Sequence, residues 1–470
     1  MSQGIADELA GICLGDERLN QRSRKVIEAL AANPEASINA AVNGWGDTQA
    51  AYRFFNNANV TPEQILEPHR QATLQRMQEY PVVLVAQDTT ELDYSDHPTR
   101  DALCLNQENR FGLYHHVQLV LTPERLPLGV VATHAFDREP ETLGKERKDS
   151  AAQKRRPIEE KESFRWLEGY RTACDLAEKC PNTRVISVAD READIYDIFL
   201  EAQSISGPKA DYLIRAHEDR STPERDREAS RRTYHKVREQ VESSPLRATR
   251  TITLSATPKR EAREARVEVR AIRTAVKPPN HRPGLAVITH NVVLVQEVDG
   301  PGDGSAVCWL LVTTLPIDTV AQILTVVEYY AARWLIETYF RVLKTGCRVE
   351  RIMLETKSRL LNCLAMYNII AWRVLYVTYL NRTCPTLPCT AVFTAEEWQP
   401  AWRVVRKSAP PLTPPPLNEF MKLITHLGGY NNRATEPPAG PQPIWTGLRR
   451  MLDFSTAWLT FTQASRDVCN

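Results

Sequence analysis

The chain has 470 residues, of which 42% are hydrophobic, 25% charged and 7% aromatic, and its formal net charge is +1 at pH 7. This length allows two or three domains with a sizeable core, and the composition excludes a disordered or fibrous chain. The near-zero charge neither supports nor excludes a nucleic-acid partner, although many DNA-binding domains are strongly basic.

The N-terminal segment and the cysteines indicate where the protein resides. No basic segment is followed by a long apolar one, and no apolar run approaches the roughly 20 residues that span a bilayer, so we expect neither a secretory signal nor a membrane span. Ten cysteines are scattered without CxxC pairs. This pattern is typical of reduced intracellular thiols rather than of disulfides or a zinc site, and it favours a cytoplasmic protein.

Arginine and lysine cluster in three stretches, residues 145–157, 220–232 and 259–270. Acidic residues accompany them in each case. A mixed-charge surface is therefore the simpler interpretation, and a DNA contact is the alternative.

The first part of the chain favours helices. Apolar residues recur at helical spacing between residues 14 and 30, and a second helical segment covers residues 48–57. A third, residues 61–80, begins with a Thr-Pro pair, which is a typical helix start. We therefore expect a helical domain over residues 1–70.

From residue 81 the pattern changes to strands. Residues 81–90 form a continuous apolar run that ends in polar residues, as a buried central strand would. The following segments predict strands at 112–122, 126–136, 184–190 and 210–217, and helices at 160–180 and 194–202. The order β-β-β-α-β-α-β matches an α/β, ribonuclease-H-like (retroviral-integrase-like) core, with helices on the faces of a mixed sheet.

Residues 233–315 read almost entirely as strands, and they separate the core from a long predicted helix over 319–344. We interpret this block as an inserted β-subdomain. The core with its insertion is then expected over residues 71–370, followed by a helical C-terminal domain over 371–470.

Two aspartates follow predicted core strands, Asp88 after the first and Asp190 after a later parallel one. Reactive groups in open α/β sheets gather at the carboxyl ends of the strands. Neighbouring carboxylates repel each other unless a cation lies between them, and hard divalent cations prefer oxygen ligands. For each aspartate a turn or helix-capping role is the alternative, especially for Asp190.

The predicted helix 319–344 carries Tyr330, Arg333, Glu337 and Lys344 in the pattern Y-x2-R-x3-E-x6-K. The spacings of four and seven residues predict one shared face for the last three, with the tyrosine one turn earlier. A solvated charged stripe is the alternative. The flanking residues are strongly apolar, however, so the helix is expected to be packed and its polar stripe to need partners. A metal-binding carboxylate, with phosphate-binding Tyr, Arg and Lys side chains, would fit that need.

These motifs resemble the DDE transposases of the insertion sequence four family, most closely its transposon-five branch. The resemblance is carried by Asp88 in QDTTELDY, Asp190 in DREADIY and the Tyr330–Lys344 helix. It continues through nearly the whole chain, at LGDERLNQR (14–22), AYRFFNNANV (51–60), EKESFRW (160–166), CWLLVT (308–313) and LGGY (427–430). The chain departs from that branch at Leu113 and Tyr114, where a tryptophan pair is usual, in the β-block, and around PPAGPQP.

The resemblance implies a cut-and-paste DNA transposase. Asp88, Asp190 and Glu337 would hold two Mg²⁺ or Mn²⁺ ions about 4 Å apart, which clamp the attacking and leaving oxygens of an in-line displacement. Water would cut the transposon end, and the new 3′-OH would form a hairpin with the opposite strand. A second water would open the hairpin, and the freed 3′-OH would join target DNA.

The resemblance also implies DNA contacts. Trp309 would stack on a base flipped out near the cut. Tyr330, Arg333 and Lys344 would hold the phosphates of that nucleotide, with Arg215 as a weaker match in the same pocket. A core tryptophan on a strand is the alternative for Trp309.

Further matches lie outside this pocket. His116 fits a histidine beside the active site. Three arginines in the N-terminal domain match residues that grip the terminal repeat, although each could be an ordinary surface arginine: Arg18, Arg22 and Arg53.

The expected partners are double-stranded DNA, as transposon end repeats and target, and a second copy of the chain in a dimer that pairs through its C-terminal helices. No membrane is expected, and the bacterial nucleoid is the expected location. The first alternative is a ribonuclease-H-like metal nuclease without strand transfer, which would not need Trp309 or the Tyr/Arg/Lys helix. A DNA-binding inhibitor of transposition and a hydrolase using two carboxylates as acid and base are the others.

Overall fold

The computed structural model describes residues 4–468, except 43, 98, 100, 102–103, 108, 139–155, 227–232, 255–261, 434 and 437. The chain divides into two compact units. The sheet unit consists of Met77–Asp88 and Gly144–Trp334, and the helical unit of Met1–Arg76, Thr89–Leu143 and Leu335–Asn470. Of the three basic stretches, residues 145–155, 227–232 and 259–261 lie outside the described residues.

The sheet unit begins with the order β-α-β-α-β, whereas the two strands predicted at 112–122 and 126–136 belong to the helical unit. The strands of the sheet unit are β1 (Val82–Asp93, as far as Asp88), β4 (Arg184–Ala189), β5 (Asp211–Arg215), β6 (Ser221–Asp226), β7 (Thr233–Lys236), β8 (Leu246–Leu254), β9 (Arg263–Val276), β10 (Ile288–Glu297) and β11 (Cys308–Thr313). Its α-helices are α6 (Phe164–Lys179), α7 (Tyr196–Ser204), α8 (Val237–Glu242) and α9 (Val320–Ala332).

The main sheet of this unit runs β1-β4-β5-β11-β10-β9-β8. The first three strands are parallel, and β11, β10, β9 and β8 follow in antiparallel pairs. Residues Val83–Ala86 of β1 are fully buried, as expected for a strand covered on both faces. The result is the mixed sheet predicted for the core.

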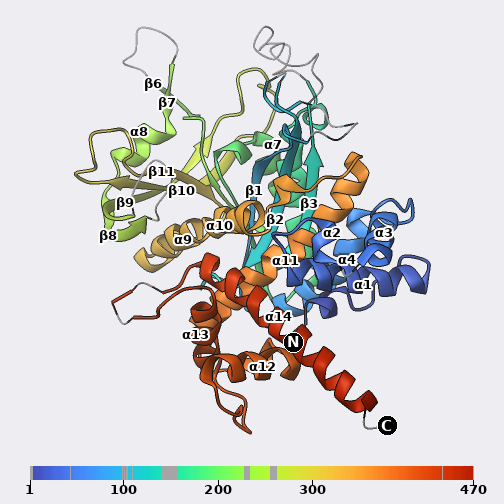
Figure 1. Ribbon diagram of the computed structural model, residues 1–470. Helices are drawn as coiled ribbons and strands as arrows, with labels where there is room; N and C mark the ends of the chain where they lie inside the picture. Colours follow the sequence, from blue (N-terminus) through green and yellow to red (C-terminus); the bar gives the residue numbers. More distant parts are fainter. Residues whose placement is uncertain are drawn as a thin grey trace. The chain divides into compact units, whose positions relative to one another are not determined.

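The strands predicted between residues 233 and 315 continue this sheet beyond β11. Figure 1 shows β8, β9 and β10 side by side, with α8 beside them. In β9, buried and exposed residues alternate over much of the strand, which is typical of an antiparallel strand with one covered face.

The helical unit gathers both ends of the chain around a β-hairpin. Its elements before and within the hairpin are η1 (Ile5–Leu9), α1 (Glu17–Ala32), α2 (Ile38–Ala41), α3 (Gly44–Phe55), α4 (Pro62–Met77, as far as Arg76), β2 (Gly112–Leu121) and β3 (Pro127–Phe136). The later elements are α10 (Leu335–Arg341), α11 (Lys357–Thr383), α12 (Ala395–Arg406), α13 (Leu417–Leu427) and α14 (Pro441–Val468). Helix α14 packs against α12, α13 and α1 (Figure 1).

Helix α11 is the core helix of this unit. By length and composition it is apolar enough to cross a membrane, although no such segment was expected from the sequence. Within its most apolar window, 89% of the residues are buried inside the protein. The helix packs on β3, so its apolar composition is explained by burial in the protein.

A buried ion pair ties η1 to α4. The fully buried Glu8 carboxylate accepts hydrogen bonds from Arg76 at 3.0 and 3.2 Å and lies 2.5 Å from Nδ1 of His69. The main-chain N–H of Val130 on β3 donates to Nε2 of His69, so the ring proton sits on Nδ1 and is donated to Glu8. The guanidinium of Arg76 stacks on Trp372 of α11, 4.6 Å from its ring centroid. Residues of η1, α4, β3 and α11 therefore meet at one buried charge cluster.

The single helix predicted over 319–344 is wrong. The structure divides it into α9 (Val320–Ala332), α10 (Leu335–Arg341) and a π-helical turn (Val342–Gly346). At the break, the N–H of Arg333 bonds to the carbonyl of Tyr330, three residues back. At the π-turn, the N–H of Cys347 bonds to the carbonyl of Val342, five residues back. Both steps depart from the regular i−4 ladder.

The shared face predicted for Arg333, Glu337 and Lys344 rests on a period of 3.6 residues, which holds only within an uninterrupted α-helix, and it stays a prediction. Arg333 and Lys344 have different partners. Arg333 bonds to Asp88, whereas Lys344 bonds to the main-chain carbonyl of Glu91.

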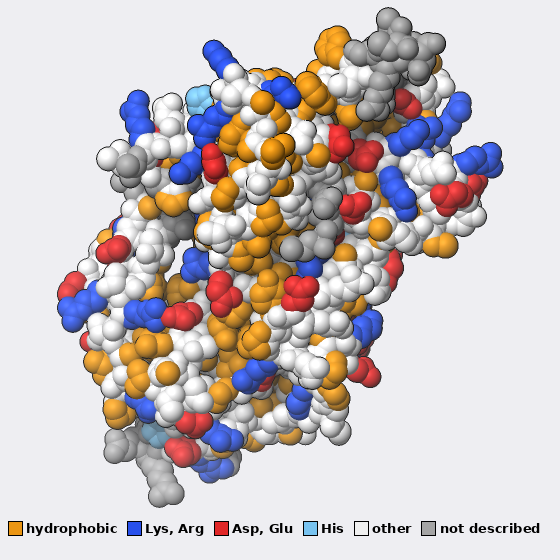
Figure 2. All heavy atoms as spheres, turned by 90° about the horizontal axis from the view of Figure 1, so that it is seen from below, with side chains coloured by type: hydrophobic (Ala, Val, Ile, Leu, Met, Phe, Trp, Pro, Cys, Tyr) orange, Lys and Arg blue, Asp and Glu red, His pale blue; other side chains and the backbone are white. Residues whose placement is uncertain are grey.

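The surface is of mixed charge. Figure 2 shows a face on which Lys, Arg, Asp and Glu side chains lie interspersed, with hydrophobic side chains between them. Every cysteine in the described part of the chain is a free thiol, as predicted.

Candidate active site

Asp88 and Asp190 occupy equivalent positions on neighbouring parallel strands. The last paired residues of β1 and β4 are Gln87 and Ala189, and the two aspartates come next. Gln87 donates to the hydroxyl of Ser187 at 2.8 Å on one face of the sheet. Because side chains alternate along a strand, Asp88 and Asp190 project from the other face, on strands spaced about 4.8 Å apart.

The two aspartates differ in their local setting. Asp190 caps the short 3-10 helix that follows β4, because its carboxylate accepts the N–H of Glu192 at 2.9 Å. The capping role weighed from the sequence is therefore present. The strand expected to end near residue 90 continues to Asp93, since β1 pairs with β2 after its pairing with β4 has ended. Asp88 thus lies within β1, directly after the last residue that pairs with β4.

Arg333 holds Asp88. Its Nη1 donates to Oδ2 of Asp88 at 2.6 Å, and the two side chains are only 10% and 18% exposed. A short, charge-assisted hydrogen bond in a partly buried setting is stronger than a surface ion pair.

An aromatic pair lies beside this ion pair in the sheet unit. Trp309 on β11 and Tyr330 on α9 meet edge to face with their ring centroids 5.0 Å apart. The guanidinium of Arg333 lies 5.8 Å from the Tyr330 ring. Burial raises the pKa of Tyr330, and the charges of Arg333 and Arg215 oppose that rise while the charge of Asp190 adds to it. The ring of Trp309 and the charges of Arg333, Arg215 and Asp190 therefore all act on Tyr330.

Arg215 ends β5, next to β11 in the sheet. It pairs with Leu311 in the antiparallel register and donates from Nη2 to the carbonyl of Cys308 at 3.2 Å. The sheet unit thus brings together six of the residues predicted from the sequence: Asp88, Asp190, Arg215, Trp309, Tyr330 and Arg333.

The remaining predicted residues belong to the helical unit. Glu337 lies in α10 and is half-buried. Lys344 in the π-turn donates to the carbonyl of Glu91 at 2.8 Å and forms an ion pair with Glu350 at 3.1 Å. Glu350 also accepts the N–H of Asp93 at 3.0 Å. Sequence reasoning missed Glu350, because nothing periodic links it to Lys344 across the π-turn.

Three family models match the chain. A transposase DNA-binding model matches residues 1–60, a transposase DDE domain matches residues 170–372, and a transposase Tn5 dimerisation domain matches residues 369–461. The chain belongs to the Tn5-like DDE transposases. It is a DNA-binding enzyme that forms a homodimer. Asp190 and Glu337 lie inside the DDE match, and Asp88 precedes it.

Members of this family use divalent metal ions, and the donor set of the transposase can be tested for one. In the part of the chain that the structure describes, no group of three or more His, Cys, Asp or Glu side chains converges closely enough to hold a metal. Asp88 and Asp190 nevertheless present carboxylate oxygens from one face of adjacent strands, which is the ligand chemistry that Mg²⁺ and Mn²⁺ prefer. The pairing of Asp88 with Arg333 shows that a positive charge is stabilised there. Two predicted ligands therefore fit the ion.

His116 lies in the hairpin of the transposase. It is buried on β2, and its Nδ1 is 2.9 Å from the hydroxyl of Thr89, the residue after Asp88.

The arginines expected to grip DNA differ in exposure. Arg18, in the first turn of α1, is 91% exposed and pairs only loosely with Asp16 at 3.2 Å. Arg22 is 32% exposed and pairs with Asp47 at 3.0 Å. Arg53 near the end of α3 lies 3.5 Å from Gln49. Arg18 and Arg53 are thus exposed, whereas Arg22 is partly buried.

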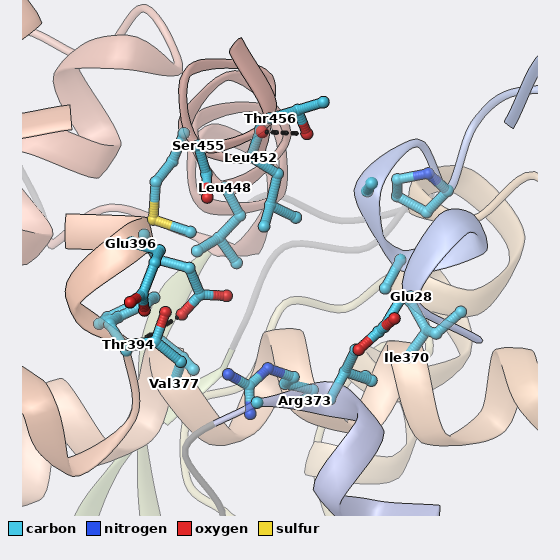
Figure 3. Close-up of a pocket in the computed structure, with 18 of the residues that line it drawn as sticks. Glu28, Ile370, Arg373, Val377, Thr394, Glu396, Leu448, Leu452, Ser455 and Thr456 are labelled. Carbon is cyan, nitrogen blue, oxygen red and sulfur yellow. Dashed lines mark hydrogen bonds between the residues drawn. The ribbon is translucent and has the colours of Figure 1, made fainter. Parts of the chain in front are cut away.

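A separate cavity of about 460 Å³ lies in the helical unit, between α1, α11, α12 and α14. Figure 3 shows Glu28 of α1 and Arg373 of α11 pointing toward it from one side, with Leu448 and Leu452 of α14 facing them. None of the predicted site residues lines it. It lies where the matched DNA-binding and dimerisation segments meet.

The dimerisation segment also carries exposed apolar side chains. On α14, Trp458, Leu459 and Phe461 are 39%, 41% and 72% exposed. Exposed apolar side chains clustered on one helix are typical of an association surface.

Proposed function

We propose that this DDE transposase moves its element by a cut-and-paste reaction. Water cleaves the strand at the transposon end and frees a 3′-OH. That hydroxyl attacks the opposite strand, which closes a hairpin on the transposon end and releases the flanking DNA. A second water opens the hairpin, and the 3′-OH then attacks a phosphodiester of the target. The observation that carries the proposal is the in-register pair Asp88 and Asp190, with Arg333, Tyr330 and Trp309 beside it.

Asp88, Asp190 and Glu337 are proposed to hold two divalent ions, Mg²⁺ or Mn²⁺. When bound, such ions make an oxygen nucleophilic at neutral pH and stabilise the leaving oxygen. Glu337 follows Arg333, whose side chain contacts Asp88, by four residues along the chain. That proximity along the chain, together with its place inside the DDE match, supports Glu337 as the third ligand.

The flipped base is proposed to stack on Trp309. Its contact with Tyr330 fixes the indole from one side, and an aromatic platform of this kind contributes roughly 1–3 kcal/mol per base. Tyr330, Arg333 and Lys344 would hold the phosphates of that nucleotide, with Arg215 behind them. His116, through Thr89, would fix the strand that carries Asp88.

The domain organisation is proposed as residues 1–70 for DNA-end binding, 71–370 for the catalytic core and 371–470 for dimerisation. The matched segments at 1–60 and 369–461 support the two ends. The strands β8 to β10, which extend the sheet beyond β11, support an insertion over about residues 233–315. Arg18, Arg22 and Arg53 would contact the terminal repeat. A cytoplasmic, nucleoid-associated location follows from a DNA substrate.

The deciding experiment incubates the purified chain and Mg²⁺ with labelled duplexes taken from the flanks of its own gene. We expect nicked, hairpin and joined products, all of which disappear in Asp88→Asn and Glu337→Gln. The matched control is Asp175→Asn, which removes the charge of an exposed acid on α6 and should leave every product in place.

Other outcomes separate the alternatives. Nicks without hairpin or joined products would support a nuclease without strand transfer. Binding without any cleavage would support an inhibitor of transposition. Full activity in Asp88→Asn would overturn the proposed triad.

A further inference from the structure

We infer that Arg333 is a positioning residue that occupies Asp88 until DNA draws its guanidinium away, so that metal binding at the two aspartates depends on DNA binding. The inference rests on the proposed function, in which Asp88 and Asp190 are metal ligands. It adds an order of binding that the reaction itself does not require, in which DNA binds before metal.

The contact between Arg333 and Asp88 is the first observation. Nη1 of Arg333 lies 2.6 Å from Oδ2 of Asp88, one of the two oxygens of the carboxylate proposed to bind metal. Both side chains are largely buried. A guanidinium and a divalent ion compete for the same oxygen lone pairs, and the two positive charges also repel each other. Metal binding at this oxygen therefore requires Arg333 to leave.

The second observation is the aromatic pair near Arg333. Its guanidinium lies 5.8 Å from the ring of Tyr330, which in turn contacts Trp309. Arg333 thus contacts the acid and lies near the surface proposed to receive a base and its phosphate. A planar guanidinium binds phosphate as readily as carboxylate, so an incoming phosphate is a competing partner for the same side chain.

The backbone at Arg333 permits such an exchange. The residue caps α9, where the helical ladder is interrupted before α10 begins. Lys344, the other cation of the motif, is anchored to Glu91 and Glu350 instead. Of the two cations, Arg333 is therefore the one that contacts a predicted metal ligand.

The coupling has a thermodynamic consequence. If DNA raises the affinity for metal, metal raises the affinity for DNA by the same factor. A chain without DNA is then a poor metal binder, which protects other DNA from cleavage by an unpaired enzyme. Removing Arg333 should abolish that dependence.

The test measures Mn²⁺ binding by the full-length chain without DNA, using electron paramagnetic resonance of free Mn²⁺ and titration calorimetry. We expect Arg333→Gln to bind Mn²⁺ at least about tenfold more tightly than the unmodified chain, because a hydrogen bond to a charged group is removed from the ligand. Arg333→Lys, which keeps the charge, should remain close to the unmodified chain. The matched control is Arg184→Gln, which breaks a similar ion pair with Asp211 at the opposite end of β4 and should change nothing.

A second arm adds a saturating duplex from the flanks of the gene. DNA should raise the Mn²⁺ affinity of the unmodified chain and leave that of Arg333→Gln almost unchanged. Thermal unfolding of each variant confirms that it is folded, and Arg333→Met, which also removes the charge, serves if Arg333→Gln is not.

The failure of the inference and the failure of the proposed function give different results. If Asp88→Asn weakens Mn²⁺ binding by the DNA-bound chain while Arg333→Gln without DNA binds Mn²⁺ like the unmodified chain, the gating role of Arg333 is overturned and the metal site stands. If Asp88→Asn does not alter Mn²⁺ binding by the DNA-bound chain, Asp88 is not a metal ligand and both are overturned.

Discussion

Replacing Glu8 tests the buried cluster that joins η1 to α4. Burial by itself would raise the pKa of Glu8, but the hydrogen bond from His69 and the charge of Arg76 outweigh it and lower the pKa from 4.5 to about 2. At 1.36 kcal/mol per pKa unit, that difference corresponds to about 3 kcal/mol of stability. The loss of one partner from a buried ion pair costs about 3–5 kcal/mol, which is the same range.

We expect Glu8→Gln to lower the free energy of unfolding by about 3 kcal/mol at pH 7, in spite of its equal size. The carboxylate of Glu8 accepts hydrogen bonds with both oxygens, from His69 and Arg76. A glutamine would turn an N–H group toward one of these donors, leaving it unpaired and buried. The melting temperature should fall by about 6–12 °C.

The contribution of Glu8 to the free energy of unfolding depends on pH. Because the pKa of Glu8 is lower in the folded protein than in the unfolded chain, its contribution is complete above about pH 4.5 and is lost as the pH falls toward 2. The gap between the unmodified chain and Glu8→Gln should therefore be constant from pH 7 to about 5 and narrow below that. Urea unfolding at a series of pH values measures it.

The control is Glu63→Gln, an exposed acid in the first turn of α4, which should change the stability by less than about 0.5 kcal/mol. A loss below 1 kcal/mol in Glu8→Gln, or a gap of the same size at pH 3 as at pH 7, would refute the assignment of a buried carboxylate.

Three further predictions address the base platform, the DNA grip and the packing. Trp309→Ala should reduce hairpin formation by about 5- to 150-fold, the equivalent of 1–3 kcal/mol, while Trp309→Phe retains part of it; equal loss in both would argue against stacking. Arg18→Ala should weaken end binding and reduce the slope of log K against log salt by about 0.9, measured by fluorescence anisotropy; an unchanged slope would remove Arg18 from the phosphate contacts. Gly129→Ala should destabilise the helical unit by about 1–3 kcal/mol, because the new Cβ would meet the Thr73 hydroxyl at 1.8 Å, whereas Gly207→Ala, with open space around it, should be neutral in the same thermal unfolding assay.

Much of the fold could be predicted because the decisive signals are local. The apolar run at Val83–Ala86 is continuous, and the alternation in β9 has period two, so each predicts its own kind of strand. The parallel pairing of β1 with β4 then follows from the intervening helix, and it brings Asp88 and Asp190 into register. Residue types and order were enough to predict that pair.

The remaining features depend on contacts between distant residues. The polar residues that end β1, up to Asp93, extend the strand only because β2 pairs with them. The break before α10 contains no proline or glycine that could have predicted it, and it coincides with the bond from Arg333 to Asp88. Likewise, Glu8 and His69 are 61 residues apart, and no periodic pattern connects them.

The cavity between α1 and α14 bears on how such a chain can evolve. The DNA-binding and dimerisation models match separate stretches of sequence, yet α1 and α14 pack together and line one hollow within a single compact unit. If the first 60 residues were replaced by those of a relative, the new α1 would therefore meet an α14 to which its surface is not matched. We therefore expect the DNA-binding and dimerisation segments to be inherited together, because their helices pack against each other.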